Sequence, residues 1–185
     1  TTPMSLRHDP TYVAAEIAVF LRQLSARFGK HQVCTVGKVD VFPNLINVVA
    51  ARVVLTLDVR NTDEKLLQQA EQEIAKFLEE IALAEGVKIS TKQLARFEPV
   101  EFDPRVIDII ESIAKQHSNT VQRMPSGAGH DAQMLARVCP SAMIFVPSVN
   151  GISHNPAEHT DTDDLVAGAN ILLHTMLTLC ATEIV

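Results

Sequence analysis

Two segments with apolar side chains at the spacing of an α-helix constrain the fold of this chain more than any other feature. Residues 11–28 carry the first pattern after a helix-start signal at Pro10, and the pattern ends at Gly29. The second pattern runs over residues 63–85, behind a capping Asn-Thr-Asp-Glu sequence, and ends at Gly86. The sequence therefore predicts two amphipathic helices, each with an apolar face that needs a partner layer.

Extended segments between and after these helices supply that layer. Residues 32–41 alternate polar and apolar side chains, Pro43 and Asn44 turn the chain, and residues 46–59 form a second extended run. Residues 87–97 follow the second helix and predict a further strand. The order helix, strand, strand, helix, strand indicates a two-layer α/β sandwich.

The pattern changes at residues 98–104, where two prolines and three acidic residues interrupt it. We expect another unit to begin there. It contains a predicted amphipathic helix at 104–117, a short helix at 133–137, a buried strand at 142–146 and a long helix at 163–181.

Composition excludes several classes of function. The formal charge is −6, aromatic residues make up 4% of the chain, and Trp is absent, so nucleic acid is not expected as a partner. No apolar stretch approaches the roughly 20 residues of a bilayer-spanning helix, so no membrane partner is expected either. The cysteines, Cys34, Cys139 and Cys180, form no CxxC motif, which indicates a reducing, cytoplasmic compartment.

Polar loops beside apolar runs hold the candidate site residues of the second unit. His154 follows the predicted strand 142–146, where an imidazole can reach a metal, although a solvent-facing loop histidine has the same pattern and Zn sites need three or four ligands. Gly129 and His130 lie in a Gly-Ala-Gly-His-Asp sequence whose glycines permit positive φ or close approach to a ligand. The first backbone N–H groups of the following helix could donate hydrogen bonds to a carboxylate, but a tight strand-to-helix turn explains the same residues.

Two further candidates lie in the first unit. Arg60 ends a predicted strand, where its guanidinium can hold a carboxylate with two hydrogen bonds or pair with Asp58 or Asp63 at the surface. Asn47 opens the same run and can donate its amide to a carbonyl oxygen, or act as a turn residue after Pro43.

The chain resembles a known family through five sequences that occur in order. These sequences are TTPMSLRHDP at 1–10, TVG at 35–37, NV at 47–48 with LTLDVR at 55–60, PSGAGHDA at 125–132, and VPSVNGISHNPAE at 146–158. Together they resemble the hydantoinase/carbamoylase family of dinuclear-metal amidohydrolases, which includes N-carbamoyl-L-amino-acid hydrolases and allantoate amidohydrolases.

The resemblance implies that the chain is an incomplete enzyme. Residues 1–98 would form the lid or dimerisation domain, an α/β sandwich without its first strand. Residues 99–185 would form the C-terminal portion of a zinc-peptidase-like α/β catalytic domain. The absence of an initiator Met at position 1 agrees with a processed or truncated piece.

The resemblance also implies roles for individual residues. His154 would be one ligand of a pair of divalent ions, Zn, Mn or Co. Asn47 and Arg60 would hold the substrate across a homodimer, Arg60 through the substrate carboxylate, and Gly129 with His130 would line the same pocket. No catalytic base is expected in this chain.

The implied reaction is metal-dependent hydrolysis of the carbamoyl C–N bond of an N-carbamoyl-L-amino acid, allantoate or another ureido acid. We expect the isolated chain to be inactive, because one ligand cannot hold a catalytic metal. The alternatives are a non-catalytic dimerisation or carboxylate-binding module, and an aminoacylase or peptidase of the same superfamily.

Overall fold

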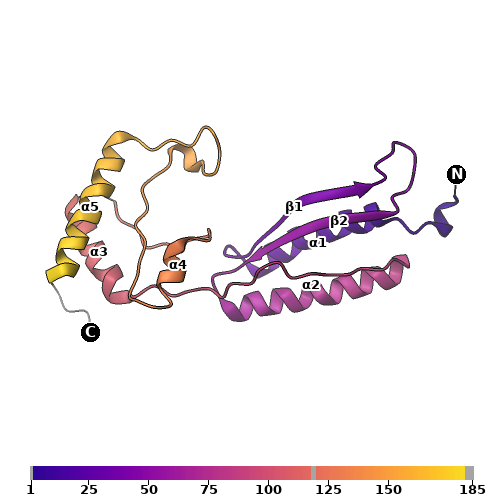
Figure 1. Cartoon of the computed structure of the whole chain (residues 1–185), viewed down its shortest axis with the longest axis horizontal. Coiled ribbons are helices and arrows are strands. Elements are labelled where there is room, and N and C mark those ends of the chain that lie inside the picture. The colour runs from indigo at the N-terminus through magenta and orange to yellow at the C-terminus, as the bar shows by residue number, and fades with distance from the viewer. Residues whose placement is uncertain (1, 118–119, 182–185) are drawn as a thin grey trace. The chain divides into compact units, whose positions relative to one another are not determined.

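The chain forms two compact units, residues 1–99 and 100–185 (Figure 1). The structure is a computed structural model that describes residues 2–117 and 120–181. Thr1, with which the first family-like sequence begins, lies outside the described residues.

Two long helices form one layer of the first unit. The helix α1 spans Pro10–Phe28, and Asp9 caps it by accepting a hydrogen bond from the backbone of the first turn. The helix α2 spans Glu64–Glu85, is capped in the same way by Asp63, and ends at Gly86, whose φ of 63° is left-handed. Both helices predicted from periodicity are therefore confirmed.

A two-stranded antiparallel sheet forms the other layer. The strands β1 (Val33–Phe42) and β2 (Arg52–Arg60) pair from Val33 opposite Arg60 to Phe42 opposite Arg52, with an irregularity in the ladder at Gly37. The second strand was predicted to begin at residue 46, and this boundary is wrong. Residues 43–51 form the hairpin loop, because the chain needs them to turn back and re-enter the ladder.

The core of the first unit lies between the two layers. Phe20 of α1 and Phe77 of α2 stack with ring centroids 4.1 Å apart. The side chains of β1 and β2 that face the helices alternate with exposed ones, as a half-buried sheet requires. The fully or nearly buried members of the core are Val13, Ile17, Leu21, Leu24, Ala70 and Ile74.

The predicted strand at 87–97 does not form a ladder. Val87 and Ile89 do pack against the core, so the expected alternation of buried and exposed side chains is present at the start of the segment. Arg96 then pairs with Glu64 at 2.5 Å and Glu71 at 3.0 Å, which ties the segment to α2. The segment is extended, but within the described residues no strand pairs with it, and the prediction of a third strand is wrong.

Helices dominate the second unit. The helix α3 (Pro104–His117) packs against α5 (Thr162–Ala181) through a small cluster of buried apolar side chains. Between them lie the short helix α4 (Asp131–Leu135), two residues earlier than predicted, and a 3-10 turn, η2 (Val149–Gly151). Together with the first unit this makes a mixed α/β chain whose described sheet has two strands.

The predicted buried strand at 142–146 is also extended without a ladder, so that prediction is wrong for the described residues. The segment instead packs on α5. A Cβ built on Gly168 would lie 2.4 Å from Cγ1 of Val146, so the absence of a side chain at Gly168 is what lets the two segments approach. An apolar run can form a buried strand only where neighbouring strands satisfy its backbone.

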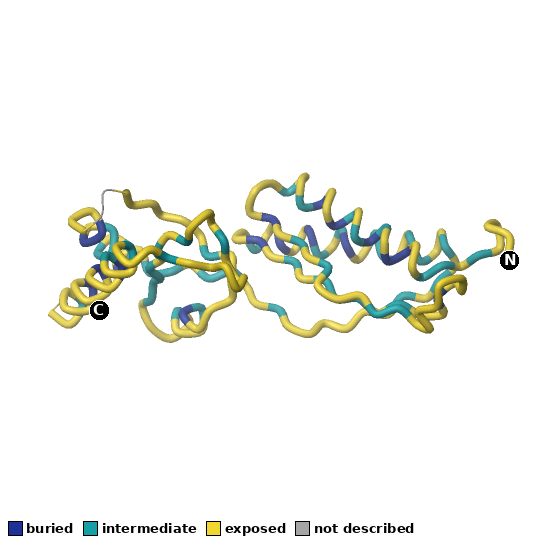
Figure 2. The backbone as a smooth tube through the Cα atoms, turned by 90° about the horizontal axis from the view of Figure 1, so that it is seen from above, coloured by how far each residue is buried: buried dark blue, intermediate teal, exposed yellow. Residues whose placement is uncertain are grey.

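The helix α5 is apolar around most of its circumference. One narrow stripe, with Gly168, Ile171 and Thr175, is buried. Most other positions of the helix are exposed (Figure 2), and large apolar residues are among them. By length and composition α5 could cross a membrane, with 17% of its apolar window buried, which corrects the expectation that no stretch reaches this length. Core helices of soluble proteins pass the same test, because a helix buried on all sides is apolar on all sides.

Candidate functional site

Arg60 lies at the last position of β2, on the sheet face that points away from the helices. Its Nε and Nη2 each donate to the Asp58 carboxylate at 2.7 Å, an arrangement with two parallel hydrogen bonds. Both side chains are about half exposed. Of the two ion-pair partners that the sequence offered, Asp58 is the one that the structure uses.

The ion pair changes the acidity of both groups. Hydrogen bonding to Arg60 lowers the pKa of Asp58 below its ordinary value, against a smaller opposing effect of burial. The same hydrogen bond raises the pKa of Arg60. The aspartate therefore stays charged and holds the guanidinium on the open face of the sheet, where a cation can attract a carboxylate.

A buried amide pair lies behind Arg60, and sequence reasoning missed it. Gln32, 5% exposed, donates through Nε2 to the backbone carbonyl oxygen of Arg60 at 3.0 Å. Its Oε1 accepts from Nδ2 of Asn61, 8% exposed, at 2.9 Å, and Asn61 Oδ1 accepts from the backbone N–H of Asp63 at 2.9 Å. In the sequence these residues look like ordinary turn residues, and only the register of β1 against β2 brings them together.

Asn47 lies in the exposed hairpin loop 43–51, and not at the start of a strand as predicted. The loop connects the ends of β1 and β2 at which Phe42 pairs with Arg52. Arg60 lies at the opposite end of β2. Eight residue steps separate Arg52 from Arg60, about 26 Å at the rise of a β-strand. Within one chain, Asn47 and Arg60 are therefore too far apart to contact the same small molecule.

His130 caps the short helix α4. Its Nδ1 accepts a hydrogen bond from the backbone N–H of Ala132 at 3.0 Å, so that amide is already occupied. Gly127 and Gly129 do not adopt a left-handed φ. Of the two explanations for these glycines, close approach of a ligand to the backbone is therefore the one that remains. A Cβ on Gly129 would meet no atom within 4 Å, so the chain itself leaves open space there.

His154 lies exposed at a loop position with a φ of 54°. Its backbone N–H donates to Oε2 of Glu158 at 2.7 Å, and the loop is closed by a hydrogen bond from Val149 N–H to the His159 carbonyl oxygen at 2.8 Å. Among residues 2–117 and 120–181, no group of three or more His, Cys, Asp or Glu side chains is arranged to hold a metal ion. His154 is therefore positioned as a single donor.

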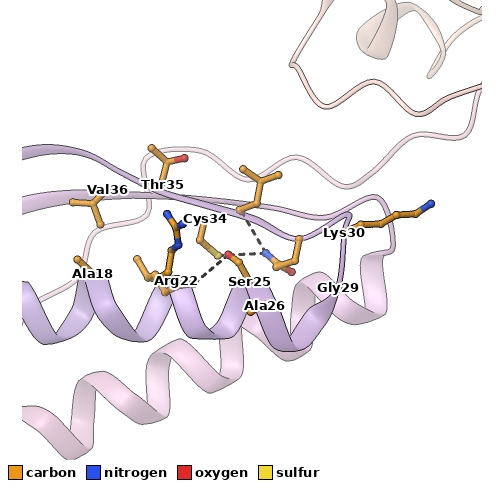
Figure 3. A pocket seen from close by; sticks show the side chains of 12 residues that line it. Ala18, Arg22, Ser25, Ala26, Gly29, Lys30, Cys34, Thr35 and Val36 are labelled. Carbon is orange, nitrogen blue, oxygen red and sulfur yellow. Dashed lines mark hydrogen bonds between the residues drawn. The ribbon is translucent and has the colours of Figure 1, made fainter. Parts of the chain in front are cut away.

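An open groove lies between α1 and the start of β1 (Figure 3). Arg22 and Ser25 come from the helix, and Cys34 and Thr35 come from the strand. None of the residues proposed from sequence lines this groove. The structure thus places Arg60 and Asn47 at opposite ends of one hairpin. In the second unit, Gly129 and His130 lie on one loop and His154 lies on another.

The chain is similar to known proteins over nearly its whole length. The model of peptidase family M20/M25/M40 matches residues 9–178. An N-carbamoyl-L-amino acid amidohydrolase of Geobacillus stearothermophilus is 39% identical over 182 residues, which are 98% of this chain and 44% of the relative. An allantoate amidohydrolase of Escherichia coli K12 is 36% identical over 172 residues, 93% of this chain and 42% of the relative.

Solved structures give the same picture. A hydantoinase/carbamoylase family amidase of Burkholderia vietnamiensis is 33% identical, with a TM-score of 0.90 over 96% of this chain and 43% of that one. The structure of AtUAH in complex with glyoxylate is 29% identical, with a TM-score of 0.91 over 98% of this chain and 44% of that one. The chain thus spans about two-fifths of the length of these relatives.

Proposed function

Because this chain belongs to peptidase family M20/M25/M40, and within it to the hydantoinase/carbamoylase amidohydrolases, we propose that it is the lid and the C-terminal part of a metal-dependent amidohydrolase. The enzyme would hydrolyse the carbamoyl C–N bond of an N-carbamoyl-L-amino acid or of allantoate. Both compounds carry a carboxylate beside the ureido group, so the enzyme needs a cation that recognises the carboxylate.

The observation that carries this proposal is the setting of Arg60. It is a guanidinium held by Asp58 on the open face of a sheet, in a chain that is 39% and 36% identical to enzymes named for two such acids. AtUAH, whose fold matches at a TM-score of 0.91, was solved with glyoxylate, another small carboxylate. Arg60 would bind the acid group of the substrate, and Gly129 with its open space would let the substrate approach the backbone.

We also propose that residues 1–98 are the lid and that this lid lacks one strand. A helix is about 10 Å across and strands lie about 4.8 Å apart, so two helices side by side cover about four strands. The described sheet has two, and the extended segment 87–97 lies on the same core without a ladder. One empty position between β2 and residues 87–97 accounts for both facts.

The positions of Asn47 and Arg60 support a proposed homodimer. If both residues contact one substrate, the distance of about 26 Å between the hairpin ends requires that they come from two copies of the chain. A two-fold dimer places the two ends of one hairpin against the opposite ends of its partner and forms two equivalent sites. The lid is the natural contact surface, because it carries both residues.

His154 fits one ligand position of a metal pair. Its imidazole is exposed on a loop fixed by Glu158, and a neutral imidazole is a good ligand for Zn, Mn or Co. Metal ions, when bound, supply an activated water and polarise the scissile carbonyl. The further ligands would lie outside this chain, so we expect residues 1–185 alone to be inactive. We also propose a reducing, cytoplasmic compartment, because the cysteines of the sequence form no CxxC motif.

Hydrolysis of a substrate panel tests this function. The panel contains N-carbamoyl-L-amino acids, N-carbamoyl-β-alanine and allantoate, with Mn, Co or Zn, and it is applied to this chain and to the protein encoded by the complete gene. Activity in the complete protein alone supports the proposal and identifies the substrate. Turnover by the 185-residue chain contradicts the assignment of the remaining ligands to another part of the protein.

The second candidate is a non-catalytic module that dimerises and binds carboxylates. It is favoured by one observation: the described residues contain no cluster able to hold a metal. No hydrolysis by the complete protein, together with a dimer in size-exclusion chromatography with light scattering, would support this reading over the enzyme.

A further inference from the structure

The backbone carbonyl of Arg60 accepts a hydrogen bond from the buried side-chain amide of Gln32. Gln32 precedes β1, Asn61 follows β2, and their side chains meet across the open end of the hairpin. Gln32 Nε2 donates to the carbonyl oxygen of Arg60 at 3.0 Å, and more weakly to that of Val33 at 3.4 Å. The open end of the hairpin is the place where a two-stranded ladder frays most easily.

Buried polar side chains are retained at a cost, because each one needs a partner in place of water. Gln32 and Asn61 are 5% and 8% exposed, and they satisfy each other. Asn61 in turn accepts from the backbone of Asp63, which caps α2. The hydrogen bonds of Gln32 and Asn61 therefore connect three elements: the start of β1, the end of β2 and the start of α2.

We propose that Gln32 and Asn61 are positioning residues for the carboxylate site, acting through Arg60. They fix the backbone of Arg60 in the last ladder position, while Asp58 fixes its guanidinium. A carboxylate held by two hydrogen bonds needs its arginine within a few tenths of an ångström, so a frayed strand end weakens recognition of the acid. This inference rests on the proposed role of Arg60.

The test compares two substrates in the protein encoded by the complete gene. One is the N-carbamoyl amino acid that it hydrolyses best, and the other is the carboxamide of the same compound, which lacks the negative charge. The measured quantity is the ratio of kcat/KM for the acid to kcat/KM for the carboxamide. General damage to the fold lowers both values and leaves the ratio unchanged, whereas a misplaced Arg60 lowers the ratio.

Gln32→Leu removes the donor and keeps the size of the side chain. We expect it to lower the ratio about tenfold, the effect of one hydrogen bond to a neutral acceptor. Arg60→Met serves as the reference, with a larger loss of ratio. Gln72→Leu makes the same substitution on the exposed face of α2 and should leave the ratio unchanged.

Gln32→Glu keeps the test decisive if Gln32→Leu does not fold. It keeps an oxygen that accepts from Asn61, and it donates to the Arg60 carbonyl only when protonated, which burial favours. We expect the ratio of this variant to be low at about pH 8 and to recover towards pH 5.5, while the ratio of the unmodified protein changes less.

Each outcome decides between two statements. If Arg60→Met lowers the ratio and neither Gln32 variant does, the positioning role is wrong and the carboxylate role of Arg60 stands. If Arg60→Met leaves the ratio unchanged, Arg60 does not bind the acid, and the inference fails together with that part of the proposed function. A lowered ratio in all three variants, with the recovery at low pH, supports both.

Discussion

If the proposed two-fold dimer forms, mixing two impaired variants should restore activity, because Asn47 and Arg60 lie at opposite ends of the same hairpin. In a two-fold dimer each site then takes Asn47 from one chain and Arg60 from the other. A dimer of one Asn47→Ala chain and one Arg60→Ala chain has one site with both substitutions and one site with neither. Each variant by itself is expected to lose about 10- to 100-fold in kcat/KM, the effect of a lost hydrogen bond to a charged group.

The recovery can be calculated. With equal amounts and random pairing, half of the dimers are mixed and each keeps one of two sites, so the mixture recovers about a quarter of the unmodified activity. The assay is hydrolysis of the preferred substrate by the complete protein after co-expression or co-refolding, with each variant mixed with itself as the control. If mixed dimers are isolated through two affinity tags and show only single-variant activity, the two residues do not form a site across the dimer.

Three further predictions test individual contacts. Gly168→Ala should destabilise the second unit, because overpacking against Val146 costs about 1–3 kcal/mol while the gain in helix propensity is about 1 kcal/mol. In a chain that already carries Val146→Ala, the same Gly168→Ala substitution should instead stabilise the unit, as measured by urea titration. Asp58→Asn should make the free energy of unfolding depend less on pH at acid pH. The lowered pKa of Asp58 adds stability above the ordinary aspartate pKa of about 4, and this stability is lost as the pH falls through the pKa of the folded state. Below about pH 4, a plot of the free energy of unfolding against pH should therefore have a shallower slope for the variant than for the unmodified chain. Gly129→Ala should leave thermal unfolding unchanged, since its Cβ meets no atom of the chain, but should raise KM in the complete enzyme, and an unchanged KM would remove Gly129 from the pocket.

Local signals were sufficient to predict the helices. Periodicity with capping residues located α1 and α2, since a helix satisfies its backbone within its own segment. The same reasoning failed for residues 87–97 and 142–146. Both segments have the side-chain pattern of strands and pack on a core. An extended segment forms a strand only when another segment pairs with its backbone, and the pattern does not show whether such a partner exists.

The candidate site shows the same division between local and non-local information. The position of Arg60 at a strand end and the loop setting of His154 follow from nearby residues, and the structure has both. The hydrogen bond from Gln32 to Arg60 joins residues 28 positions apart in the chain, so no local pattern singles out Gln32. The extended pattern predicts Asn47 on a strand because it begins at residue 46, six residues before β2 begins at Arg52.

The exposed faces of α5 have a practical consequence for anyone who fractionates cells that express this chain. Large apolar side chains line those faces, and a chain that presents them to water will self-associate and sediment, so it will be found in the same pellet as lipid vesicles. Flotation on a sucrose gradient separates the two cases, since aggregates stay at the bottom and bilayer proteins rise. Recovery of the chain in the dense fraction would reflect an uncovered core helix. The side chains concerned are Leu165, Val166, Leu172, Leu173, Met176 and Leu177.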